Sequence, residues 1–240
     1  ESQGKMGEAS QKRLMRSSTV GADRSLKGEE GEIIETAGVH PSSNVIAVAF
    51  KNSIKIYQIL YNEIRGVKEI LVSFCKDIGF NRSGSILFAK VGGKQGSKIY
   101  LYNAINNYEF MEVLSANKPI EAIRFSPLDH IIYAIHQHGY YTWNAESLFK
   151  HRSDYGGEVP FQIKGTEFYG STLVLWGEQD VLSIPTVGTP EHTKLSKQIN
   201  NLIIQKEYVV VSTPAGELYR CKGIAQINNN LLGQSFSTFP

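Results

Sequence analysis

The sequence lacks most of the features that mark secreted and membrane-spanning proteins. Its 240 residues include only two cysteines, Cys75 and Cys221, which lie far apart and have no histidine or further cysteine at metal-ligand spacing. Free, buried thiols in a reducing compartment are therefore expected. The longest unbroken apolar run, Val45–Phe50, is far too short for a membrane-spanning helix. No apolar stretch follows the N-terminal charges, as one would in a signal peptide.

The chain also lacks a strong excess of either charge. It carries 25 lysines and arginines against 23 aspartates and glutamates, a formal net charge of +2. Six of the basic and three of the acidic side chains lie in residues 1–28, so the remaining residues carry 19 basic and 20 acidic groups. A region this close to neutral does not have the basic surface that nucleic-acid binding requires. We expect residues 1–28 to form a polar, mostly disordered segment.

What the sequence does contain is a repeated unit, which is most complete at Ile120–Asn144. There an apolar stretch leads into the turn Ser126–Asp129, a second apolar run covers Ile131–Ile135, and a polar turn precedes Tyr140–Trp143. Short apolar runs rich in β-branched and aromatic residues, bounded by turn residues, are typical of strands.

The same unit recurs along the chain with a regular spacing. An apolar anchor residue at the approach to a turn recurs at intervals of 36 to 45 residues, at Val39, Phe80, Phe125, Phe168 and Ile204. Each anchor is followed by a second apolar run, another turn and a third run. A period of about 40–45 residues with several strands per repeat is typical of a blade of a WD-repeat-like β-propeller. The predicted fold is therefore all-β, with about five blades in residues 29–240.

The outermost strand of each blade is less clear. We expect it at Tyr108–Leu114 in the second repeat, at Ser147–His151 in the third, and at the polar, poorly patterned Ile64–Ile70 in the first. Mixed charge is usual in such strands, because one face meets solvent and the edge must not recruit another sheet.

Both ends of the sequence resemble cuts through a larger ring. Ser18–Leu26 resembles the second strand and turn of a repeat, so a remnant of a preceding blade is the alternative to disorder for part of residues 1–28. Pro240 follows soon after the fifth repeat. We expect part of a larger propeller, and a complete five-bladed ring is the alternative.

The aromatic end of the third strand is a further repeat feature. Trp143-Asn144 stands where WD repeats place their Trp-Asp pair, and Tyr102-Asn103 and Tyr57-Gln58 are the corresponding pairs. Such an aromatic residue packs between neighbouring blades. However, no Gly-His precedes the anchors, and Asn or Gln replaces the Asp. The buried His–Asp hydrogen-bond network of WD repeats should then be absent, which leaves apolar packing to hold the blades together.

No pattern in the sequence points to catalysis, a cofactor or a metal. His136 and His138 would share a face of a strand, but no cysteine, aspartate or third histidine stands beside them at ligand spacing. The glycine-rich stretch Gly92–Ser97 resembles a phosphate loop, yet it precedes a strand rather than a helix and is predicted to be a hairpin turn. We expect no catalytic, cofactor-binding or metal-binding residues, and the pattern does not identify the residues that bind partners.

One stretch is more specific than the general repeat. His40–Tyr57 combines an HPSS turn with an apolar strand and a basic-apolar strand, and Asn62–Glu69 adds an acidic linker of the form IR-x-x-KE. This stretch, together with Cys75–Asp77, resembles the second propeller of the WD-repeat cilia- and flagella-associated proteins. The likeness returns at Tyr141–Asn144 and covers roughly half of the chain.

The resemblance implies a non-enzymatic scaffold of the axoneme of cilia and flagella, with a cytoplasmic location otherwise. Its partners would be axonemal proteins, either the inner dynein arm, a regulatory complex or the doublet microtubule, and regions outside this chain would provide any coiled-coil contact. Neither nucleic acid nor membrane is an expected partner. Two alternatives stay open, because a fold does not fix a function. One is a WD-repeat adaptor of a trafficking or ligase assembly, and the other is a propeller enzyme with its site at the central channel.

Overall fold

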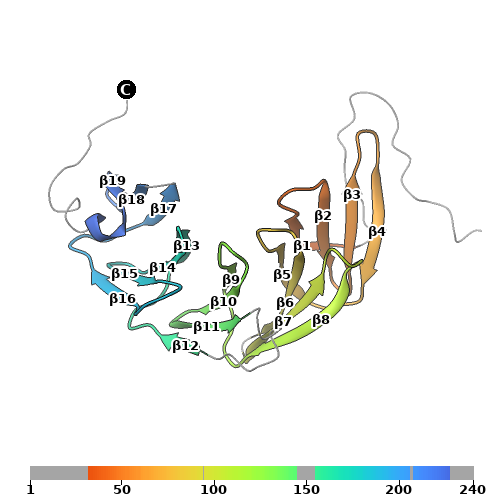
Figure 1. Ribbon diagram of the computed structural model, residues 1–240, viewed down its shortest axis with the longest axis horizontal. Helices are drawn as coiled ribbons and strands as arrows, with labels where there is room; N and C mark the ends of the chain where they lie inside the picture. Colours follow the sequence, from red (N-terminus) through yellow and green to blue (C-terminus); the bar gives the residue numbers. More distant parts are fainter. Residues whose placement is uncertain (1–31, 94, 145–154, 206–207, 228–240) are drawn as a thin grey trace, which may run out of the picture.

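The computed structural model describes residues 32–93, 95–144, 155–205 and 208–227. These residues form antiparallel sheets in which consecutive strands are neighbours (Figure 1). The predicted polar segment 1–28 lies outside the described residues. No helix in the described part of the chain is long and apolar enough to cross a bilayer.

Each sheet is one blade. Blade 1 comprises β1 (Ile34–Val39), β2 (Val45–Phe50), β3 (Ile54–Ile59) and β4 (Ile64–Ile70). Blade 2 comprises β5 (Cys75–Phe80), β6 (Ile86–Gly93), β7 (Gly96–Asn103) and β8 (Glu109–Ala116). Blade 3 comprises β9 (Ala122–Phe125), β10 (Ile131–His136), β11 (Gly139–Asn144) and β12 (Tyr155–Glu158).

The last two blades follow the same plan. Blade 4 comprises β13 (Gly165–Tyr169), β14 (Thr172–Trp176), β15 (Asp180–Ile184) and β16 (Glu191–Lys194). In blade 5 the described strands are β17 (Asn201–Gln205), β18 (Tyr208–Ser212) and β19 (Leu218–Lys222), followed by the 3-10 helix η2 (Ile224–Gln226).

The blades are arranged along an arc. The first strands, β1, β5, β9, β13 and β17, lie on its concave side, and the outermost strands lie on its convex side (Figure 1). Neighbouring first strands touch, since β1 contacts β5 and β13 contacts β17. This is the arrangement of propeller blades around a channel, and it confirms the fold predicted from the repeat.

Apolar side chains fill the space between neighbouring blades. The second strand of a blade is buried on both faces, which explains its unbroken apolar run. In β10, Ile132 and Ala134 pack toward blade 2, whereas Tyr133 and Ile135 pack toward blade 4. Trp143 is 2% exposed in the core between blades 2 and 3, which confirms its predicted place. Each Ile or Leu side chain that is fully buried in these cores stabilises the folded state by about 1.5–3 kcal/mol.

The outermost strands agree only in part with the ranges predicted from the sequence. β4 occupies the predicted range, and β8 begins one residue later than expected and extends to Ala116. The outer strand of blade 3 is β12, and the predicted range Ser147–His151 lies outside the described residues. β16 was not predicted, because its sequence EHTK is short and polar.

Candidate interaction surfaces

The turns between the first and second strands lie on one face of the arc, where His40 joins two blades. His40 Nε2 lies 3.1 Å from the carbonyl oxygen of Gly84, and because a carbonyl only accepts, Nε2 is the donor. Nδ1 accepts the backbone N–H groups of Ser42 and Ser43 at 3.2 and 3.1 Å. The ring also packs edge-on against Phe80, with the ring centroids 5.0 Å apart. One side chain thus closes its own turn and holds the turn of blade 2.

Asp129 holds the same blade-2 turn from the other side. Its two carboxylate oxygens accept the backbone N–H groups of Arg82 at 3.1 Å and Ser83 at 3.0 Å. Asp129 has a φ of 58°, in the left-handed region that aspartate tolerates better than most residues. The expectation that apolar packing alone holds the blades is therefore wrong for blades 1 to 3. Asp129 ends the predicted turn Ser126–Asp129, and no residue near it in the sequence indicates a partner more than forty residues away.

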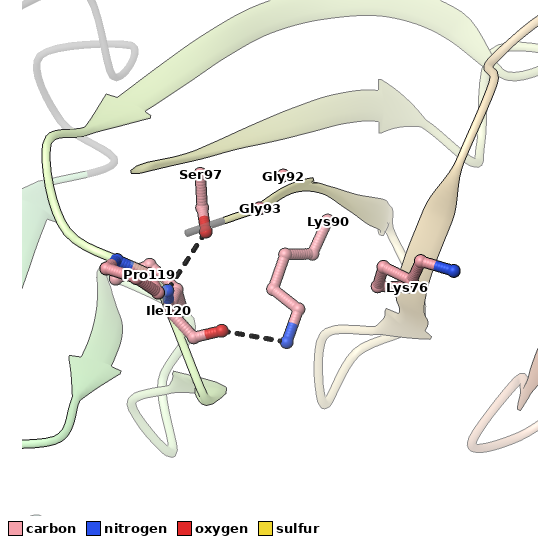
Figure 2. Close-up of a pocket in the computed structure, with 7 residues that line it drawn as sticks. All are labelled: Lys76, Lys90, Gly92, Gly93, Ser97, Pro119 and Ile120. Atoms are coloured by element: carbon pink, nitrogen blue, oxygen red, sulfur yellow. Dashed lines mark hydrogen bonds between the residues drawn. The ribbon is translucent and has the colours of Figure 1, made fainter. Parts of the chain in front are cut away.

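On the opposite face, a cavity of about 340 Å³ lies at the junction of blades 2 and 3 (Figure 2). Lys90 Nζ donates to the carbonyl oxygen of Ile120 at 3.0 Å and lies 3.8 Å from a carboxylate oxygen of Asp77. Ser97 Oγ accepts the Ile120 N–H at 2.9 Å. Lys76 points away from Lys90 in Figure 2 and pairs with Glu35 of β1 at 3.0 Å. Because both cations have partners within the chain, the cavity is a joint between blades rather than an anion site.

The glycine-rich stretch beside this cavity forms the hairpin between β6 and β7. Gly93 pairs with Gly96 at its end, and Gly92 and Gly96 have φ angles of 155° and 144°. No helix follows it, so the prediction of a hairpin turn rather than a phosphate loop is confirmed.

The histidines of the third repeat do not converge. His136 ends β10 and is 5% exposed, and its Nδ1 accepts the N–H of His138 at 3.3 Å. His138 Nδ1 lies 3.2 Å from the carbonyl oxygen of Phe161, while His130 is exposed in another turn. Burial lowers the pKa of His136 below its ordinary value. In the ranges that the structure describes, no group of three or more His, Cys, Asp or Glu side chains could hold a metal.

As predicted, both cysteines are buried and neither forms a disulfide. Burial raises the pKa of Cys75 to about 11, and the thiol donates to the carbonyl oxygen of Asp77 at 3.3 Å. A thiol held protonated in this way is not a nucleophile at neutral pH.

An apolar groove of about 510 Å³ runs along the outer part of blade 2 where it faces blade 1. Blades 1 and 2 lie next to each other along the arc (Figure 1). Its walls are the connector Ile70–Ser73 and the side chains of Val91, Tyr100, Tyr102, Phe110 and Val113. Phe110 is 59% exposed and Leu71 is 84% exposed. Nothing in the repeat pattern identified this groove, because its residues come from four separate segments.

Comparison with known proteins finds a similar sequence and solved structures of similar fold. The chain is 38% identical over 68 residues to the cilia- and flagella-associated protein 57 of Mus musculus, and the aligned segment is 28% of this chain and 5% of the mouse protein. No protein-family model matches the chain.

The solved structures resemble the chain in fold. The C-terminal WD40 domain of Sif2 superposes with a TM-score of 0.61 at 16% identity, covering 80% of this chain and 58% of that one. Hsv2 of Kluyveromyces lactis superposes with a TM-score of 0.55 at 10% identity, covering 84% of this chain and 62% of that one. The chain therefore spans less than two thirds of the length of these two structures and a small part of the mouse protein. It is a β-propeller of the WD40 type whose sequence is similar, over a short segment, to the cilia- and flagella-associated protein 57.

Proposed function

We propose that this propeller is a non-enzymatic scaffold of the axoneme of cilia and flagella. In this role it binds inner-arm dynein or neighbouring proteins of the doublet microtubule. The observation that carries the proposal is the 38% identity over 68 residues to a cilia- and flagella-associated protein. The WD40 fold supports it, because rigid blades can present loops on two faces and along the rim to several partners at once.

Three polar side chains that join neighbouring blades support a scaffold rather than an enzyme. Asp129, His40 and Lys90 are each bonded to backbone groups of a neighbouring blade. The central channel of a propeller enzyme would instead need acids, bases or nucleophiles directed at a substrate. These side chains act as joints that keep the blades in fixed positions.

We also propose that the five blades belong to a larger ring. Leu218 pairs with Ser212 in blade 5 as Val181 pairs with Trp176 in blade 4. Val181 is 1% exposed because it packs in the core between blades 4 and 5, whereas Leu218 is 46% exposed. The side of blade 5 that carries Leu218 is the side that a further blade would cover.

Fractionation of ciliated cells tests the axonemal proposal. Cilia are isolated from cells that express the full-length tagged protein at its natural level, and their membranes are removed with detergent. We expect the protein to stay with the axonemes together with the inner dynein arms. A pool that is found only in the soluble cytosol would contradict the proposal and favour an adaptor of a trafficking or ligase assembly.

A further inference from the structure

The outermost strand of blade 2, β8, differs from the other outermost strands. β12 and β16 have four residues each, and β4 carries Arg65, Lys68 and Glu69 among its seven. β8 has eight residues, with no lysine, arginine or proline, and it exposes Phe110 and Met111. Short length, charge and proline are the usual means by which an edge strand avoids pairing with another chain. β8 is the longest of the described outermost strands, and its two charged side chains, Glu109 and Glu112, are both acidic. Its ladder to β7 shifts register at Met111.

One backbone donor of β8 points away from the sheet. The N–H of Val113 is bonded at 2.9 Å to the carboxylate of the adjacent Glu112, a side chain of its own strand. In an antiparallel pair, alternate residues direct their N–H groups inward to the neighbouring strand or outward from the edge. The Val113 N–H is therefore on the outer edge, where a carbonyl oxygen of an added strand could replace the Glu112 carboxylate.

The two faces of β8 next to this edge have different chemistry. Val113 is paired with Tyr100 and Phe110 with Tyr102, so both project to the face that forms the groove. Glu109 and Glu112 are paired with Asn103 and Leu101, on the other face. Side chains of an added strand alternate between the faces. Every second residue would enter the groove, and the residues between them would lie beside the two carboxylates.

We propose that the outer edge of β8 binds an extended segment of a partner protein in which apolar residues alternate with basic ones. The partner adds a strand to blade 2, its apolar side chains fill the groove beside Phe110, and its basic side chains pair with Glu109 and Glu112. Strand addition of this kind takes affinity from main-chain hydrogen bonds and specificity from alternate side chains. The site gives the scaffold proposed above a surface for a protein partner.

The test uses the purified chain and a peptide as long as β8, 8 residues, of alternating valine and lysine. Binding is measured by calorimetry, and the exchange of the Val113 amide hydrogen is followed by NMR. We expect binding that slows exchange at Val113. We also expect a valine–glutamate peptide to bind more weakly, and a valine–lysine peptide N-methylated along one edge to lose the interaction.

Two variants locate the site. Phe110→Ala removes the groove wall, and Leu71→Ala changes the connector on the other side of the groove. Each should weaken binding about tenfold, the size expected for an apolar anchor. Ile105→Ala is the matched control, since Ile105 is 81% exposed in the same blade but outside the groove. It should leave the affinity unchanged, and thermal melting shows whether each variant is folded.

Three results would overturn the proposal. They are the absence of peptide binding, equal binding of the lysine and glutamate peptides, and equal weakening by Phe110→Ala and Ile105→Ala. A chain that dimerises, and that becomes monomeric on Phe110→Ala alone, would assign the edge to a second copy instead. The experiment uses the isolated chain outside the cell. A negative result would therefore overturn the binding site on β8 without contradicting the axonemal location.

Discussion

The carboxylate of Asp129 in blade 3 lies 3.0 Å from the backbone nitrogen of Ser83 in blade 2, 46 residues away in the sequence. With the bond to Arg82, it ties the inner turns of two blades together. Replacing Asp129 with alanine removes both bonds and places alanine at a positive φ, so we expect a loss of about 2–3 kcal/mol. Asp129→Asn keeps one acceptor and tolerates the backbone, so its cost should be about 0.5–1.5 kcal/mol.

Urea unfolding measures both changes in the Asp129 position. The control is Leu128→Ala in the same turn, where the side chain is 74% exposed, and its effect should stay within about 0.5 kcal/mol. If Asp129→Ala is no more destabilising than the control, the bonds between the turns do not contribute to stability.

A second prediction concerns Gly84, which lies in the blade-2 turn that His40 contacts. Its φ is 77°, and a Cβ atom there would lie 2.1 Å from His40 Nε2. Gly84→Ala should therefore cost about 2–4 kcal/mol, from backbone strain and from the clash together. Gly216→Ala has a similar φ of 82° but no atom within 4 Å, and should cost only about 1–2 kcal/mol.

The double variant separates the two causes at Gly84. His40→Ala removes the ring that the new methyl group would strike, so Gly84→Ala should cost less in that background than in the natural chain. The loss of stability caused by Gly84→Ala is read from unfolding midpoints in the natural chain and in His40→Ala. Equal losses in the two would show that His40 does not approach the turn closely.

A third prediction compares two lysines beside the cavity between blades 2 and 3. Lys90 has a side chain that is 12% exposed and donates to the carbonyl oxygens of Ile120 and Glu121. Lys90→Met leaves these acceptors unpaired and should cost about 1–3 kcal/mol. Lys76 is 52% exposed in its pair with Glu35, so Lys76→Met should cost less than about 1 kcal/mol. Thermal unfolding at matched ionic strength compares the two, and the reverse order would reject a joint at Lys90.

A fourth prediction concerns pH. Burial lowers the pKa of His136 in the folded state, so the unfolded state binds a proton more readily and acidification favours unfolding. The stabilisation is fully present above the ordinary histidine pKa of about 6.5 and is lost as the pH falls below it. Protonation of Nδ1 would also remove the acceptor for the His138 N–H. Stability measured from pH 7 to pH 5 should therefore fall less steeply in His136→Phe than in the natural chain. Parallel curves would contradict this.

The fold followed from the sequence because its signal is local. Phe80 and Phe125 end the first strands of their blades, and each is followed within a few residues by the turn and the buried strand that define the repeat. The burial of Trp143 followed from its place at the end of a third strand. Patterns of this kind depend on neighbours within one hairpin, so one sequence is enough to show them.

The contacts between blades could not be predicted in the same way. His40 and Gly84 are 44 residues apart, and only the angle between two blades brings them together. The groove beside Phe110 is lined by four separate segments of the chain, and no local pattern shows that they come together. The sequence does not predict β16, because its four polar residues lie on a solvent-facing edge. They do not show the alternation of apolar and polar residues by which a strand is predicted.

The proposal that this propeller is an axonemal scaffold is tested most directly by chemical cross-linking of intact axonemes, followed by mass spectrometry. Lys68 of β4 is half-buried and Lys98 of β7 is exposed, and these lysines would report which proteins lie beside blades 1 and 2. We expect cross-links from these lysines to inner-arm dynein or to proteins of the doublet microtubule. Cross-links found only to components of a soluble, non-ciliary assembly would contradict the axonemal role.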